Sequence, residues 1–262
     1  MSNFVTHFSH LEDKRVQGRT DYPLLELLFL CICAILSGSD GWEDIEDWGI
    51  AKLVWLRKYL AYENGIPCHD TIARVISRIS PVALQKGFIE WIKSVAQLTQ
   101  GEIIAIDGKR SRGSYDRRSR KEALHMVSAW ACQNGVVLGQ QKTADKSNEI
   151  TAIPALLELL ELKGCIVTID AMGCQKAIAQ KIVEGGADYV LALKGNQGEL
   201  DDSVTDFFKI ALENNFKNIE HDKHSRVDGD HGRIEEHVCY AVAVPDYLTF
   251  VTKPWKKLQT LK

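Results

Sequence analysis

The sequence lacks a long uninterrupted hydrophobic run, a cleavable leader pattern and a strong net charge. Its most apolar stretch, LLELLFLCICAIL from Leu24 to Leu36, is too short to span a bilayer and contains Glu26, so it predicts a buried helix. The formal net charge is -3, which excludes a general attraction to nucleic acid or to an anionic membrane. Any basic surface must therefore be local, and we expect a soluble globular protein with no membrane partner.

Paired cysteine motifs are also missing. The 7 cysteines include no C-x-x-C, and most of them lie within apolar runs. A scattered, odd set of this kind argues against a disulfide framework or zinc ligation and is typical of reduced core thiols in the cytosol. We therefore expect a cytoplasmic protein.

The first part of the chain, residues 1–98, has helical periodicity. Hydrophobic spacing, punctuated by Gly and Pro, predicts helices over residues 24–37, 42–48, 51–62, 71–77 and 82–98. In the segment PCHDTIARVISRISP, Asp70 is a candidate helix cap, and Arg74 and Arg78 share a polar face. This helix is either the recognition helix of a helix-turn-helix or an ordinary amphipathic helix with solvated arginines; the sequence favours neither.

The second part, residues 99–262, alternates β-rich and helical segments. Strands are predicted at EIIAID, LHMVSAWACQ and GVVLGQQKT, the last two joined by a hairpin turn at Asn134-Gly135. Helices over 149–162 and 175–184 then alternate with strands CIVTID and DYVLAL, residues 214–230 are predicted to be a loop, and HVCYAVAV is a further strand. The resulting order β-β-β-α-β-α-β predicts an α+β or α/β fold: a mixed sheet with flanking helices, in the order of the ribonuclease H fold.

Two of these strands end in an aspartate. The segment IAID ends at Asp107 and VTID ends at Asp170. If the two strands are parallel neighbours, both carboxylates leave one sheet edge about 5 Å apart, where they repel each other unless a divalent cation lies between them. Mg²⁺ prefers one or two carboxylates together with water and phosphate oxygens, and such a site supports phosphodiester chemistry.

A basic tract follows the first of these aspartates. Residues 109–121 contain seven Lys or Arg side chains and one acid, Asp116, so a polyanion could bind beside the metal site. The ordinary alternatives are that each aspartate caps a turn and that the basic run is a solvated loop. The conjunction of the three features favours metal-dependent phosphoryl chemistry.

Four longer stretches carry a family resemblance: IAIDGKRSRGS, KSNEITAIPALLELLELKGCIVTIDAMGCQ, DYVLALKGNQ and HGRIEEH. They closely resemble the H-repeat-associated transposase family, a branch of the DDE transposases with a ribonuclease H-like catalytic domain, and the N-terminal part resembles the helical domain that precedes it. The resemblance implies that Asp107 and Asp170 are catalytic residues that hold Mg²⁺ or Mn²⁺. It further implies DNA as the partner, a homo-oligomer, and DNA contacts at Lys109, Arg110, Arg112, Arg117, Arg118, Lys194 and Arg233, with His231 able to approach the scissile phosphate.

The third catalytic acid is where this sequence departs from the family pattern. Glu235, within HGRIEEH, aligns with a family motif residue and is the candidate, although the family places its last glutamate on a later helix. Other acids follow the fifth predicted strand, namely Glu199, Asp201 and Asp202. They could serve in a minimal ribonuclease H-like arrangement, but acids in this position are more typical of the capped, solvated start of a helix. The ending TKPWKKLQTLK resembles the start of a segment that continues, so we expect a C-terminally truncated copy that is inactive if the third acid is lost with it.

Three interpretations remain open. The first is a DDE-type transposase that cleaves and joins DNA strands. The second is a non-catalytic DNA-binding remnant of one, which would retain DNA without metal-dependent cleavage. The third is a receiver-like phosphotransfer domain, which also places aspartates at strand ends, but its doubly wound sheet would not begin with an antiparallel hairpin.

Overall fold

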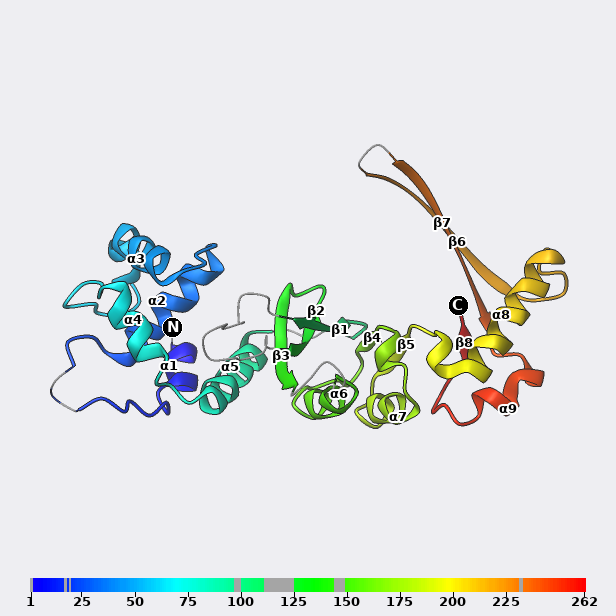
Figure 1. Ribbon diagram of the computed structural model, residues 1–262, viewed down its shortest axis with the longest axis horizontal. Helices are drawn as coiled ribbons and strands as arrows, with labels where there is room; N and C mark the ends of the chain where they lie inside the picture. The colour runs from blue at the N-terminus through cyan, green and yellow to red at the C-terminus, as the bar shows by residue number, and fades with distance from the viewer. Residues whose placement is uncertain are drawn as a thin grey trace, which may run out of the picture. The chain divides into compact units, whose positions relative to one another are not determined.

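The computed structural model divides into two compact units, Met1–Ala96 and Gln97–Lys262 (Figure 1). It describes residues 2–16, 18, 20–96, 100–110, 125–143, 149–230 and 233–262. In these ranges no helix is both long enough and apolar enough to cross a membrane. Each unit has a hydrophobic core of its own.

The first unit is helical. Its helices are α1 (Ser2–Phe8), α2 (Leu24–Leu36), α3 (Trp42–Leu56), α4 (His69–Ile76) and α5 (Pro81–Val95). The core gathers apolar side chains from four of the helices and the segments between them, and its fully or nearly fully buried members include Phe8, Leu27, Leu30, Leu56 and Ile72. The predicted buried helix at Leu24–Leu36 is confirmed.

A buried carboxylate ties α2 to the segment after α3. Glu26, only 7% exposed, accepts a hydrogen bond from the backbone N–H of Tyr62 at 2.8 Å. The phenolic OH of Tyr62 donates to the backbone oxygen of Glu26 at 2.8 Å. Burial raises the pKa of Tyr62, so its hydroxyl remains a donor at neutral pH.

Two predictions for this unit were wrong. The helices predicted over 42–48 and 51–62 are one continuous helix, α3, with Gly49 inside it. Asp70 does not cap α4, because the helix already begins at His69 with Cys68 as the N-cap. The carboxylate of Glu46 in α3 accepts from the backbone N–H of His69 at 2.7 Å, so an orphan donor of the first turn is satisfied from outside the helix.

The second unit contains a mixed five-stranded sheet. Its strands are β1 (Ile103–Arg110), β2 (His125–Ala131), β3 (Val136–Thr143), β4 (Ile166–Ile169) and β5 (Asp188–Leu191), in the spatial order β3-β2-β1-β4-β5. The pairs β1–β2 and β2–β3 are antiparallel, whereas β1–β4 and β4–β5 are parallel. An antiparallel start of this kind excludes the doubly wound sheet of a receiver-like domain.

Helices α6 (Glu149–Glu158) and α7 (Lys176–Glu184) pack on the sheet, α6 against β2 and β3 and α7 against β5. Figure 1 shows both helices beneath the strands. Strand alternation explains this arrangement, because Ile104 and Ile106 of β1 and Val167 and Ile169 of β4 are buried while their chain neighbours are more exposed.

The predicted hairpin between β2 and β3 is confirmed. Gly135 has φ +64°, a left-handed conformation that glycine adopts without strain. The fully buried carboxylate of Glu102 accepts from the backbone N–H of Gln133 and from Nδ2 of Asn134, both at 2.7 Å. Glu102 therefore holds the hairpin end against the start of β1.

A second sheet follows α8 (Gly198–Glu213). It consists of β6 (His221–Asp230), β7 (Arg233–Ala243) and β8 (Thr260–Leu261), in the order β6-β7-β8, with the short α9 (Thr249–Thr252) between β7 and β8. The predicted loop over 214–230 was wrong for residues 221–230, which form β6. Cross-strand backbone pairing with β7 runs from His221–Val242 to Asp230–Arg233 and needs no apolar face.

Candidate metal centre at the sheet edge

Asp107 and Asp170 lie level with each other on neighbouring parallel strands. The register pairs Ala105 with Thr168 and Ile106 with Ile169, so each aspartate is the next residue after the last pair. By strand alternation the two side chains project to the face opposite the buried isoleucines, and both residues are exposed. The predicted adjacency of the first and fourth strands is confirmed.

The two strands behave differently beyond this point. β4 ends at Ile169, one residue before the predicted end at Asp170, whereas β1 does not end at Asp107. It continues to Arg110 because Asp107, Gly108, Lys109 and Arg110 pair with the antiparallel β2. Asp107 therefore sits within a strand, which restricts its backbone more firmly than a loop would.

Asp170 caps the 3₁₀ turn η3 (Ala171–Gly173). Its Oδ1 accepts from the backbone N–H of Met172 at 3.1 Å and of Gly173 at 3.5 Å. The capping alternative is thus realised, but it uses only one carboxylate oxygen. Oδ2 is not part of this cap, so among the described residues it is left for a further ligand.

Asp107 has a lysine for its neighbour. Nζ of Lys109 lies 3.9 Å from Asp107 Oδ2, with the two side chains 82% and 61% exposed. Such an exposed pair stabilises little. A lysine two residues further along the strand projects to the same face, where it can contact an anion beside the carboxylates.

A single cleft of about 1370 Å³ contains both aspartates. It runs from β1, β4 and β5 to α8, and a third acid, Asp201 in the first turn of α8, also lines it. Its walls are largely apolar, including Tyr189 and Phe208. Burial raises the pKa of Tyr189 to about 12, and its hydroxyl donates to the backbone oxygen of Lys256 at 2.8 Å.

The donor set fits a hard divalent cation. Two exposed carboxylates leave most coordination positions to water and to phosphate oxygens, which is the arrangement that Mg²⁺ prefers. Within the described ranges no group of three His, Cys, Asp or Glu side chains converges closely enough to hold a metal ion. The cleft therefore offers two carboxylates at the sheet edge, and Asp201 lines it from α8.

Two amides that the sequence analysis did not single out position the segment after β5. Asn196 Nδ2 donates to the backbone oxygen of Ala171 at 2.7 Å, and Gln197 Nε2 donates to that of Cys174 at 3.0 Å. They hold η4 (Gly195–Gln197) against the turn that follows Asp170. Lys194, exposed at the N-cap of η4, is therefore attached to the same edge of the sheet.

Glu235 lies elsewhere in the second unit. It is in β7, directly opposite Asp228 of β6, and its Oε2 is 3.6 Å from His237 Nε2. It does not line the cleft that contains Asp107 and Asp170. The structure thus brings together Asp107, Asp170, Lys109 and the Lys194 segment, and it does not bring Glu235 to them.

Several of the predicted DNA contacts cannot be placed, because the structure does not describe their side chains. Arg112, Arg117, Arg118 and His231 lie outside the described residues. Arg110 and Arg233 have described backbones in β1 and β7, but their side chains are outside the description.

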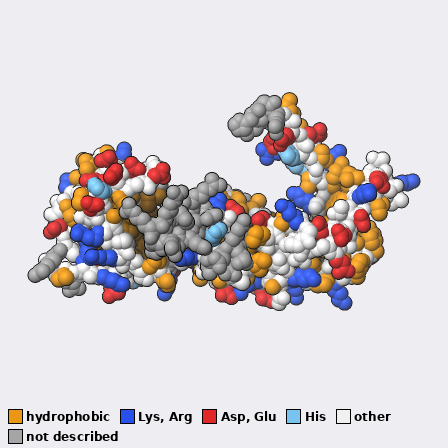
Figure 2. Space-filling view, viewed as in Figure 1, with side chains coloured by type: hydrophobic (Ala, Val, Ile, Leu, Met, Phe, Trp, Pro, Cys, Tyr) orange, Lys and Arg blue, Asp and Glu red, His pale blue; other side chains and the backbone are white. Residues whose placement is uncertain are grey.

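The other basic candidates are Arg74 in α4 and Arg78, which follows the end of α4 at Ile76. Arg74 and Arg78 are both exposed, and Figure 2 shows basic side chains over α4. Arg74 donates to Thr71 Oγ1 at 3.4 Å, within the same helix. This arrangement suits both a nucleic-acid contact and an ordinary solvated face.

Each of the two units matches the model of a known protein family. Residues 98–257 match the family model described as "Transposase DDE domain", and residues 5–92 match the model "DDE_Tnp_1-associated". The chain belongs to the DDE transposase family.

Its relatives include proteins named for the H repeat. It is 45% identical to the Escherichia coli K12 "H repeat-associated putative transposase YbfD", over 95% of this chain and 97% of that protein. It is 45% identical to "H repeat-associated putative transposase YhhI" of the same strain, over 100% of this chain and 68% of that protein. It is 49% identical to "Putative transposase YncI" of Escherichia coli O157:H7, over 100% of this chain and 66% of that protein, so it spans about two thirds of the length of YncI and YhhI.

Proposed function

We propose that this chain carries the divalent-metal phosphodiester chemistry of a DDE transposase, with DNA as substrate and with Asp107 and Asp170 as the metal ligands. The observation that carries the proposal is the register: the two carboxylates are level on parallel neighbours and open into one cleft. The strand order β3-β2-β1-β4-β5 supports a ribonuclease H-like assignment for this unit. Membership of a family that typically uses divalent metal ions supports the cofactor, Mg²⁺ or Mn²⁺.

Each residue at the edge has a distinct part in the proposed mechanism. Asp107 and Asp170 would hold the cation, and the cap on Oδ1 fixes the orientation of the Asp170 carboxylate. A bound divalent cation supplies activation of the attacking oxygen and stabilisation of the leaving oxygen. Lys109 and Lys194 bind phosphate oxygens of the DNA backbone and take no proton from the reacting groups.

A third carboxylate has two candidates in this chain. Asp201 lines the cleft, whereas Glu235 belongs to the β6–β7 ribbon. We favour Asp201, because a ligand or a water-positioning acid must share the cavity with the other two. Glu235 is retained as the competing assignment, and a cleavage assay can compare the two residues.

The experiment is a strand-cleavage assay on DNA that carries the genomic flanks of the gene, with Mg²⁺ or Mn²⁺. Asp107→Asn and Asp170→Asn should each lower cleavage at least about 100-fold, and removal of the metal by chelation should abolish it. DNA binding, measured by fluorescence anisotropy in the absence of metal, should change little. Cleavage by Asp107→Asn at the rate of the parent chain would refute the proposal.

The assay also tests the second candidate function, a non-catalytic DNA-binding remnant. The observation that favours it is that no third ligand converges on the two aspartates within the described residues. The remnant predicts DNA binding by the parent chain with no metal-dependent cleavage under any of these conditions. If cleavage occurs, loss in Asp201→Asn but not in Glu235→Gln would support Asp201 as the third acid.

A further inference from the structure

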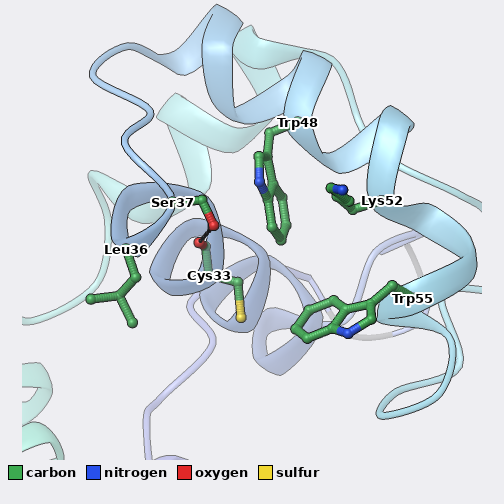
Figure 3. Close-up of a pocket in the computed structure, with 6 residues that line it drawn as sticks. All are labelled: Cys33, Leu36, Ser37, Trp48, Lys52 and Trp55. Carbon is green, nitrogen blue, oxygen red and sulfur yellow. Dashed lines mark hydrogen bonds between the residues drawn. The ribbon is translucent and has the colours of Figure 1, made fainter.

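The first unit has a hydrophobic groove between α2 and α3. It has a volume of about 410 Å³ and is lined by Cys33, Leu36, Ser37, Trp48, Lys52 and Trp55. Figure 3 shows the two tryptophan rings descending from α3, with Lys52 between them along that helix and the α2 side chains on the opposite side. We call this feature the α2–α3 groove.

Trp48 and Trp55, which form the α3 side of the groove, pack against each other and against neighbouring aromatic rings. Trp55 stacks on Phe29 with centroids 6.3 Å apart and planes 8° from parallel, and it contacts Tyr59 at 4.8 Å. The Trp48 ring meets Trp55 edge-on at 6.1 Å. A wall fixed in this way loses little conformational entropy when a partner covers it.

The groove is bordered by apolar surface that the described part of the first unit leaves uncovered. Leu36 is 79% exposed and Trp55 is 38% exposed. Both helices contribute, and α2 is apolar around most of its circumference, which is typical of a helix that is covered on all sides. Apolar surface gathered in this way marks an interaction site.

The charges along α3 indicate which partner fits. Asp44, Trp48 and Lys52 are spaced four residues apart and share one face of the helix, with Lys52 the one charged residue among those that line the groove. A two-fold axis through Trp48, perpendicular to α3, maps the position of Lys52 onto the position of Asp44, because the two lie symmetrically before and after Trp48. Two copies packed in this way form two identical Lys52–Asp44 pairs.

We propose that the α2–α3 groove is an interface with a second copy of this chain, packed antiparallel along α3 about a two-fold axis near Trp48. Such an interface is isologous, the usual form in soluble homodimers. The Asp44 carboxylate is held at the start of α3, since its Oδ2 accepts from the backbone N–H groups of Gly41 at 3.0 Å and Asp40 at 3.2 Å. Its other oxygen is available to the lysine of the second copy.

DNA is a less suitable occupant. The first half of α3 carries Glu43, Asp44 and Asp47, whose charges would repel phosphates next to the tryptophans. Figure 2 shows acidic side chains gathered over α3 on the viewed face. A protein surface with its own lysine in the matching position meets no such repulsion.

The test is sedimentation velocity of the full chain over about 1 to 100 µM, which covers weak and moderate dimer affinities. The parent chain should show a reversible dimer. Lys52→Glu, which places a glutamate opposite Asp44 in both pairs, should weaken dimerisation at least about tenfold, and Leu36→Ser should do the same by removing exposed apolar surface. Val82→Ser is the matched control, because Val82 is 77% exposed but lies at the start of α5 outside the groove.

A double variant separates the charge contact from misfolding. Asp44→Asn keeps a side-chain oxygen that can accept from Gly41 but removes the negative charge, so adding it to Lys52→Glu should recover part of the lost affinity. A chain that is monomeric throughout, or a dimer that all these variants leave unchanged, would overturn the proposal. So would a Lys52→Glu variant that loses DNA affinity while its dimer is unaffected.

This inference is independent of the metal site. Asp107→Asn, which should eliminate cleavage, should dimerise like the parent chain, and Lys52→Glu at concentrations where it is monomeric should still bind metal at Asp107 and Asp170. The two proposals can therefore fail separately.

Discussion

At the scale of single residues, Asp170 combines a structural role with the proposed ligand role. Its Oδ1 caps η3 through Met172 and Gly173. The cap is worth about 1 kcal/mol, by analogy with helix N-caps.

We therefore predict that Asp170→Ala lowers the free energy of unfolding by about 1 kcal/mol, whereas Asp170→Asn, which keeps an accepting oxygen, changes it by less than about 0.5 kcal/mol. Both variants should lose metal-dependent cleavage. Urea unfolding monitored by circular dichroism measures the first effect. Equal stability losses in the two variants would show that the cap contributes nothing.

His69 and Glu46 join α4 to α3 through a pH-sensitive contact. Nδ1 of His69 lies 2.8 Å from Glu46 Oε2. The hydrogen bond to Glu46 raises the pKa of His69 above 6.5, and the hydrogen bonds from the His69 backbone and side chain lower the pKa of Glu46 below 4.5. The contribution of His69 to the free energy of unfolding is complete below pH 6.5 and is lost as pH rises through the folded pKa of His69. The contribution of Glu46 is present above pH 4.5 and is lost as pH falls through the folded pKa of Glu46.

The pair should therefore stabilise the first unit most between these two values, and the urea midpoint of the parent chain should fall as pH rises from about 6 to 8. In His69→Gln that part of the pH dependence should be absent. His224→Gln, on the exposed face of β6, serves as the control and should retain it. Identical pH profiles for the parent and His69→Gln would contradict the prediction.

At the scale of secondary-structure elements, Gly49 explains why α3 was predicted as two helices. A glycine in a helical pattern favours a break. In the folded unit it serves close packing, since a Cβ at Gly49 would lie 2.7 Å from Leu30 Cδ1 and 3.0 Å from Ile66 Cγ2. The local sequence does not contain this information, because Leu30 and Ile66 approach only in the tertiary structure.

Gly49→Ala should consequently lower the free energy of unfolding by about 1 to 3 kcal/mol through overpacking, although alanine is the better helix former. Gly198→Ala, at the first residue of α8, should be neutral or stabilising by up to about 1 kcal/mol, because a Cβ at this position would have no atom within 4 Å. Thermal or urea unfolding of both variants measures the difference. A stabilised Gly49→Ala variant would contradict the prediction, because it would show that Leu30 and Ile66 make room for the added methyl group without loss of stability.

The second element that pattern reading missed is β6. Its sequence HDKHSRVDGD has no apolar alternation and resembles a loop, because half-buried strands are recognised by a buried face. β6 is largely exposed and is defined by backbone pairing with β7, so its signal lies in its partner. The strands that enclose a core, such as β1 and β4, were predictable for the opposite reason.

The sequence predicted the two aspartates of the candidate site but not the amides that support them. Asp107 and Asp170 follow apolar segments, and strand order alone places them at one edge. The roles of Asn196 and Gln197 depend on single hydrogen bonds to the backbone of residues 171 and 174, which no periodicity records. Their only sequence signal was the polar segment KGNQ directly after a strand.

At the scale of the whole molecule, the chain separates a helical unit from the unit that carries the candidate metal centre. Each has its own hydrophobic core, one built on α2 and its neighbours and the other including the cluster around α8. If both proposals hold, self-association belongs to the first unit and phosphodiester chemistry to the second. The two activities should therefore respond to different substitutions.

The most direct test of the central proposal is a titration of the purified full chain with Mn²⁺, followed by electron paramagnetic resonance of the free ion. The parent chain should bind Mn²⁺, and Asp107→Asn and Asp170→Asn should each weaken binding at least about tenfold, because one ligand cannot replace two. Asp228→Asn, an acid on the β6–β7 ribbon, should leave it unchanged. Equal Mn²⁺ affinity in the parent chain and in both sheet-edge variants would contradict the assignment of Asp107 and Asp170 as a metal centre.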